Sequence, residues 1–194
     1  MAREPPLKGA IMPIFDKETI KQLRQQIRTI PDFPIKGIMF RDITPLLNSS
    51  EYLNKVTDMF VQICNHNNWI PDYIVGPEAR GFIFGPMLAA KLGAGFIPVR
   101  KPGKLPSSTI QIEYSLEYGS NILEMHDDAI SPGAKIIIID DLLATGGTVD
   151  ACVKLCQQQG AEVLGNLFVI ELEGLGAREK LLPIPCESIL SYPA

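Results

Sequence analysis

The chain has no long apolar run. Its stretches of apolar residues are far shorter than the ~20 that a membrane-spanning helix needs, and the N-terminus lacks the apolar core of about 7–15 residues that marks a secretory signal. We therefore expect a soluble, cytoplasmic protein that does not bind membranes. The 194 residues, 46% hydrophobic and 21% charged, suffice for one sizeable core, so we expect a single domain over 1–194.

Histidine and cysteine are scarce. There are two histidines and four cysteines, and the cysteines show no CxxC pairing. Cys152 and Cys156 lie one helical turn apart on an apolar stripe. We therefore interpret the cysteines as small core residues rather than metal ligands, and we expect no zinc site.

Positive charge is not in surplus either. The net charge of −4 argues against binding to nucleic acids, so an anionic substrate would require a local basic patch. The candidate cations are Arg80, Arg100, Lys101 and Lys104. A basic cluster is by itself more often a solvated surface. These residues, however, follow two expected parallel strands, 72–76 and 95–99, whose carboxyl ends meet at one sheet edge.

Residues 136–151, IIIIDDLLATGGTVDA, combine an apolar run, two acids and a series of small residues. Four consecutive isoleucines without polar alternation predict a strand buried on both faces, as in a parallel sheet. From Thr148 the apolar residues recur at helical spacing, with Gly160 as a C-terminal stop. The segment therefore predicts a strand, a loop and a helix.

The loop in this segment is typical of a phosphate-binding site. Its residues are small enough for backbone amides to surround a phosphate, next to the positive end of a helix dipole. We call it the cradle: Ala144, Thr145, Gly146, Gly147 and Thr148. It matches neither GxxxxGK[ST] nor GxGxxG. Asp140 and Asp141 offer acceptor oxygens for ribose hydroxyls; alternatively they only end the strand, and the glycines only turn the chain.

Periodicity elsewhere predicts alternating strands and helices. We expect helices over 17–30, from Ser49 or Ser50 onward, and over 81–92. Further strands are expected over 95–99, 135–139 and 163–171, with shorter ones over 122–125 and 188–190. Such βα units predict an α/β fold with a doubly wound, mostly parallel sheet flanked by helices.

Two segments fall outside this alternation. Residues 100–119 are rich in Pro, Gly, Ser and Thr and exceed the about 12–15 residues of an ordinary connection, so we interpret them as a flexible lid able to form a hairpin. Residues from about 16 to 48 are expected to form a small hood over the sheet edge. We assign no role to the N-terminal extension, residues 1–15.

The motif IIIIDDLLATGGT resembles the motif of type I phosphoribosyltransferases that binds phosphoribosyl pyrophosphate (PRPP). Three further segments resemble the adenine-specific members of that family: FPIKGIMFRDITPLL from Phe33, GPEARGFIFG from Gly76 and EYSLEYG from Glu113. The resemblance extends from about Gln22 to Tyr192 and implies that a homodimer transfers the 5-phosphoribosyl group of PRPP to adenine, giving AMP and pyrophosphate in purine salvage.

The resemblance also implies roles for individual residues. The cradle would hold the 5′-phosphate, and Asp140 and Asp141 the ribose 2′ and 3′ hydroxyls. Adenine would lie against Phe40, a residue that the sequence alone fits equally well into the core. The backbone around Met39 and Arg41 would then recognise the polar edge of the base.

The lid contributes the candidate catalytic residue. We expect Glu117 to handle a purine proton through a hydrogen bond at N7, with Tyr118 covering the site. Loop composition alone would make Glu117 a surface acid. The reaction passes through an oxocarbenium-like state and needs a stabilised leaving group rather than an enzymic nucleophile.

Pyrophosphate would be neutralised by Arg80, Lys101 and Lys104. We expect Mg²⁺ as cofactor, held mainly by PRPP and water. Two alternatives stay open: a nucleotide-sensing regulator with the same fold, and the same chemistry with hypoxanthine, guanine, xanthine or orotate as the acceptor base.

Overall fold

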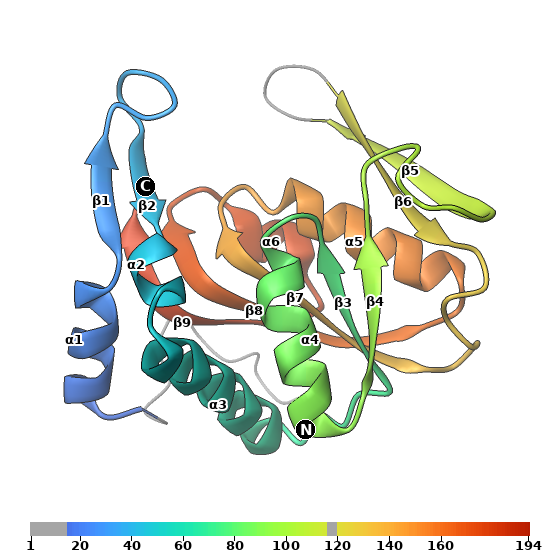
Figure 1. Ribbon diagram of the computed structural model, residues 1–194. Coiled ribbons are helices and arrows are strands. Elements are labelled where there is room, and N and C mark those ends of the chain that lie inside the picture. Colours follow the sequence, from blue (N-terminus) through green and yellow to red (C-terminus); the bar gives the residue numbers. More distant parts are fainter. Residues whose placement is uncertain (1–14, 116–119) are drawn as a thin grey trace, which may run out of the picture.

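The computed structural model describes residues 15–115 and 120–194. At its centre is a five-stranded sheet in the order β4-β3-β7-β8-β9, in which every neighbouring pair is parallel (Figure 1). The strands are β3 (Tyr73–Pro77), β4 (Gly95–Val99), β7 (Lys135–Leu143), β8 (Glu162–Glu173) and β9 (Cys186–Pro193). The predicted α/β fold with a parallel sheet is confirmed.

Helices cover both faces of this sheet. One face carries α3 (Ser50–His66) and α4 (Gly81–Leu92), and the other carries α5 (Gly147–Gln158) with the short α6 (Ala177–Leu181). No helix in the described part of the chain is long and apolar enough to cross a membrane. Helices α4 and α5 begin and end close to the predicted bounds, and α3 begins at Ser50 as predicted.

The isoleucine run of β7 forms the centre of both cores. Ile137 and Ile139 pack against the α3 and α4 side, and Ile136 and Ile138 against the α5 side, all with no exposed surface. Burying such a side chain contributes about 1.5–3 kcal/mol, which explains why no polar residue interrupts the run. All four cysteines are buried and unpaired, so their prediction as core residues is confirmed.

The hood consists of α1 (Lys17–Gln25), β1 (Arg28–Pro31), β2 (Met39–Asp42) and α2 (Thr44–Leu47). The predicted helix over 17–30 is wrong in its second half, because residues 28–31 form β1 and pair antiparallel with β2, placing Ile30 opposite Phe40. This pairing overrides the helical spacing of the apolar residues. Figure 1 shows β2 beside the C-terminal end of the chain.

The segment that we predicted as a lid, 100–119, contains the first strand of an antiparallel hairpin: β5 (Thr109–Ser115) pairs with β6 (Ser120–His126), which lies beyond the predicted segment. The strand expected over 122–125 therefore exists, but it belongs to this hairpin and not to the central sheet. Backbone hydrogen bonds between Arg100 and Glu124 attach the hairpin to the end of β4. Glu117 and Tyr118 lie outside the described residues.

Candidate functional site

The sheet has a switch point between β3 and β7. From β3 the chain crosses to β4 on one side, and from β7 it crosses to β8 on the other, so the loops after these two strands diverge. A crevice at such carboxyl ends is where α/β sheets bind ligands. A cavity of about 190 Å³ lies there and is lined by Arg80, both aspartates and every cradle residue.

The cradle owes its shape to Gly146. This residue has φ +76° and caps the N-terminus of α5, and its carbonyl accepts the first helical hydrogen bond, from the Asp150 N–H. The preceding N–H groups at the helix start have no helical partner. They are available for an anion, and the helix dipole favours one there.

Two glycines bring the start of α4 next to β7. A Cβ at Gly81 would lie 2.9 Å from the Ile139 carbonyl oxygen, and one at Gly76 would lie 3.0 Å from the Gly81 carbonyl oxygen. Only glycine fits at so close an approach. As a result Arg80, just before α4, reaches the carboxylate of Asp141 with Nε 2.8 Å from Oδ2.

The two aspartates form an acidic pair in which Asp141 is buried and Asp140 is half-buried. Both lie within β7, whereas the sequence suggested that they follow its end. The backbone N–H of Asp141 donates to the carboxylate of Asp140 at 2.9 Å. Burial raises the pKa of Asp140 well above its ordinary value, and the neighbouring Asp141 charge adds to this; burial also raises the pKa of Asp141, against the opposing effect of Arg80.

Glu78 organises the basic residues. Its carboxylate accepts from Arg100 Nε at 2.8 Å and from Lys104 Nζ at 3.2 Å. Partial burial acts to raise the pKa of Glu78, but these hydrogen bonds outweigh it and lower the pKa. The structure thus gathers two of the predicted cations, Arg100 and Lys104, on one carboxylate. Lys101 and Lys104 are both exposed. Sequence reasoning missed Glu78, although it stands within the quoted GPEARGFIFG segment.

The predicted adenine-binding residues lie on β2 in the hood. Phe40 is half-buried and meets Phe33 edge to face, with ring centroids 5.0 Å apart, so it is not a core residue. Met39 is exposed. The guanidinium of Arg41 lies 4.4 Å from the ring centroid of Tyr192 on β9, so its side chain faces the edge of the central sheet.

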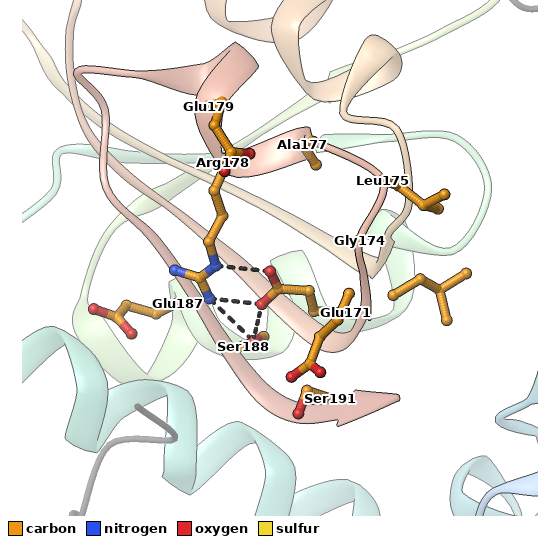
Figure 2. A pocket seen from close by; sticks show the side chains of 12 residues that line it. Glu171, Gly174, Leu175, Ala177, Arg178, Glu179, Glu187, Ser188 and Ser191 are labelled. Carbon is orange, nitrogen blue, oxygen red and sulfur yellow. Dashed lines mark hydrogen bonds and ion pairs between the residues drawn. The ribbon is translucent and has the colours of Figure 1, made fainter. Parts of the chain in front are cut away.

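A second cavity, of about 500 Å³, lies between the loop after β8 and strand β9. Figure 2 shows Arg178 donating to both carboxylate oxygens of Glu171, Nε at 2.7 Å and Nη2 at 2.6 Å, while Ser188 donates to the same carboxylate at 2.7 Å. The neighbouring Ala177 lies against the cradle, since a Cβ at Gly146 would be 3.4 Å from its Cβ. This cluster therefore supports the cradle, and no sequence pattern predicted it.

Comparison with known proteins agrees with this geometry. A family model described as the phosphoribosyl transferase domain matches residues 43–179. The chain is 53% identical to the adenine phosphoribosyltransferase of Rippkaea orientalis, covering 88% of this chain and 99% of that protein. The chain belongs to the adenine phosphoribosyltransferase family. The resemblance inferred from the motifs is thereby confirmed.

Solved structures of adenine phosphoribosyltransferases share the fold. The enzyme of Thermoanaerobacter pseudethanolicus matches with a TM-score of 0.86 and 46% identity, covering 89% of this chain and 99% of that one. The Saccharomyces cerevisiae enzyme, complexed with D-2,5-dideoxy-2,5-imino-altritol 1,6-bisphosphate and adenine, matches with a TM-score of 0.85 and 40% identity over the same shares. The domain match begins at residue 43, so it includes the cradle, the aspartates and Arg80 but not β2.

Proposed function

We propose that the chain transfers the 5-phosphoribosyl group of PRPP to N9 of adenine, forming AMP and pyrophosphate in purine salvage. The observation that supports this most is the meeting of the cradle, the aspartate pair and Arg80 in one cavity at the switch point. Family membership supplies the donor and acceptor. The role given to each individual residue is likewise a proposal.

The donor would be bound through its phosphate and its ribose. Amides of the cradle would hold the 5′-phosphate at the start of α5, where free N–H groups and the helix dipole coincide. Asp140 and Asp141 would accept hydrogen bonds from the ribose 2′ and 3′ hydroxyls. Because burial disfavours their charged forms, hydroxyl donors from the sugar would stabilise the ionised pair.

Arg80 would connect the ribose and pyrophosphate ends of PRPP. Its Nε is engaged with Asp141, but a guanidinium has further N–H donors in a planar fork, and these would serve the pyrophosphate. Lys104, held by Glu78, and Lys101 would add positive charge. Neutralising the leaving group lowers the barrier because negative charge develops there as the bond to the anomeric carbon breaks.

The expected Mg²⁺ fits a site shared with the substrate. Residues 15–115 and 120–194 contain no cluster of three or more side chains suited to hold a metal ion, and Mg²⁺ commonly binds through phosphate oxygens and retained waters. When bound, the ion would neutralise charge on the pyrophosphate. Asp140 and Asp141 would orient the ribose.

The acceptor base would lie under the hood. Phe40 would provide an apolar face and the backbone of Met39 and Arg41 the polar contacts to adenine. Glu117 would hydrogen bond at N7 as N9 attacks, and Tyr118 would cover the site. Glu117→Leu should lower the turnover rate by ~10²–10⁴-fold, and a rate equal to that of the unsubstituted protein would remove it from the mechanism.

Two broader properties are proposed on family resemblance alone. We expect a homodimer, which size-exclusion chromatography with light scattering would detect as twice the 21.4 kDa chain mass. We also expect a cytoplasmic location, in keeping with four unpaired thiols; cell fractionation tests it.

A turnover assay tests the proposed reaction. The protein is incubated with PRPP, Mg²⁺ and one base at a time, and nucleotide formation is followed by chromatography. We expect AMP from adenine and no product from hypoxanthine, guanine, xanthine or orotate. Turnover with another base would show that adenine is not the only acceptor or not the acceptor at all. No turnover with any of these bases would favour the nucleotide-sensing regulator.

A further inference from the structure

We propose that Tyr114 is a positioning residue of the cradle, whose hydroxyl orients the hydroxyl of Thr148 toward a bound phosphate. The inference rests on the proposed function, because it assumes that the cradle takes the 5′-phosphate of PRPP and AMP. It adds a residue from the hairpin to the cradle, whose own residues come from the loop after β7 and the start of α5.

The alternation of β5 places Tyr114 toward the cradle. Ile110, Ile112 and Tyr114 are half-buried and pack against the core on the α5 side of the sheet. Gln111 and Glu113, between them, are exposed. Successive side chains of a strand point to opposite faces, so the two isoleucines anchor the face of β5 from which Tyr114 extends.

The hydroxyl of Tyr114 meets the second residue of α5. Its Oη lies 3.3 Å from Oγ1 of Thr148, and the two residues are 34 positions apart in the sequence. Within the described residues this is the only side-chain hydrogen bond that joins β5 to α5. Thr148 also lines the cavity formed by the cradle and the aspartates.

Hydrogen counting fixes the direction of this bond when a phosphate is present. A threonine hydroxyl has one hydrogen and two acceptor lone pairs. A fully ionised phosphate only accepts, so Thr148 must give its hydrogen to the phosphate and accept at its oxygen from another donor. Tyr114 is placed to be that donor, and such a chain of hydrogen bonds strengthens each member.

The test removes one hydroxyl at a time. Tyr114→Phe keeps the ring that packs on the core and deletes only the donor. We expect the KM for PRPP and the Kd for AMP to rise by roughly 2- to 12-fold, the range for one net hydrogen bond, while the KM for adenine stays unchanged. Thr148→Val removes the hydroxyl that Tyr114 would orient, so adding Tyr114→Phe to it should not change these two constants further. Thr148→Ser keeps a hydroxyl, so adding Tyr114→Phe to it should raise both constants as in the parent protein.

Controls separate this inference from the proposed function. Tyr52→Phe removes a hydroxyl from α3, on the opposite face of the sheet, and should change neither constant. If the parent protein binds neither PRPP nor AMP, the proposed function fails. If it binds both and Tyr114→Phe matches it, or if the effects of Tyr114→Phe and Thr148→Val add, the positioning role of Tyr114 is overturned and the assignment of the cradle stands.

Discussion

Arg80 Nε lies 2.8 Å from Asp141 Oδ2 and thereby joins the loop that follows β3 to strand β7. The arginine side chain is 44% exposed and the aspartate only 5%, so one end of the pair faces the cavity and the other is fixed in the sheet. Arg80, proposed to bind pyrophosphate, and Asp141, proposed to bind ribose, are therefore coupled through their ion pair. A change at either should affect the whole binding site for PRPP.

Arg80→Ala should lower both stability and PRPP affinity, because it leaves the buried Asp141 without its cation. Breaking a fully buried pair costs ~3–5 kcal/mol, and the exposure of Arg80 reduces our expectation to about 1–3 kcal/mol in the free energy of unfolding. Chemical denaturation measures it. Adding Asp141→Asn should recover much of the loss; strictly additive effects would show that the pair does not act together.

Stability should depend on pH through Asp140. Burial raises its pKa in the folded state well above the ordinary aspartate value of 3.8, so the folded protein holds this proton more tightly than the unfolded chain. That contribution is fully present below about pH 3.8 and is lost as the pH rises through the raised pKa. Asp140→Asn should therefore gain stability relative to the parent protein as the pH increases, as measured by urea denaturation at several pH values.

The same substitution should weaken nucleotide binding, by about 10- to 100-fold for AMP if hydrogen bonds to a charged carboxylate are lost. Calorimetric titration of AMP and 2′-deoxy-AMP provides the internal control, since both have the same phosphate. The parent protein should prefer AMP, and Asp140→Asn should reduce that preference. A variant that loses stability at neutral pH while keeping the preference would contradict both assignments of Asp140.

Gly146→Ala should distort the cradle through its backbone. The residue has φ +76°, where a non-glycine residue costs about 1–2 kcal/mol, and the added Cβ would only touch Ala177, 3.4 Å away. We expect AMP affinity to fall by at least tenfold. Gly133→Ala is the matched control, because Gly133 has φ +82° with open space around it; it should lose similar stability but keep AMP affinity.

Glu78→Gln should weaken pyrophosphate binding without removing any positive charge. The amide would hold Arg100 and Lys104 less firmly than the carboxylate does at 2.8 and 3.2 Å. We expect product inhibition by pyrophosphate to weaken several-fold in steady-state assays while inhibition by adenine analogues is unchanged. Glu113→Gln, an exposed acid on β5, controls for charge; equal effects from both variants would refute the role of Glu78.

Local patterns in the sequence predicted the parts of the fold that depend on near neighbours. The buried strand before the aspartates, the cradle and α5 with its glycine stop needed only periodicity and turn chemistry. The strand β1 was missed because its partner, β2, lies on the far side of a turn, and the hairpin was not separated from the central sheet because both contain apolar strands. The pattern of apolar residues indicates that a segment is a strand, but it does not indicate the strand with which that segment pairs.

Within the site too, contacts between residues near in sequence were predictable and contacts between distant residues were not. Asp140, Asp141 and the cradle are adjacent in sequence, so their meeting was predictable. Arg80 with Asp141, Glu78 with Lys104, and Tyr114 with Thr148 join residues far apart in the chain. Residue type alone does not specify such partners, because each side chain is compatible with several others until the sheet order is known.

A crystal structure of the protein with AMP tests the central claim most directly. We predict the phosphate within hydrogen-bonding distance of the backbone amides of the cradle, and the ribose hydroxyls on Asp140 and Asp141. Density for the nucleotide in the larger cavity beside Arg178, or anywhere else on the chain, would contradict it.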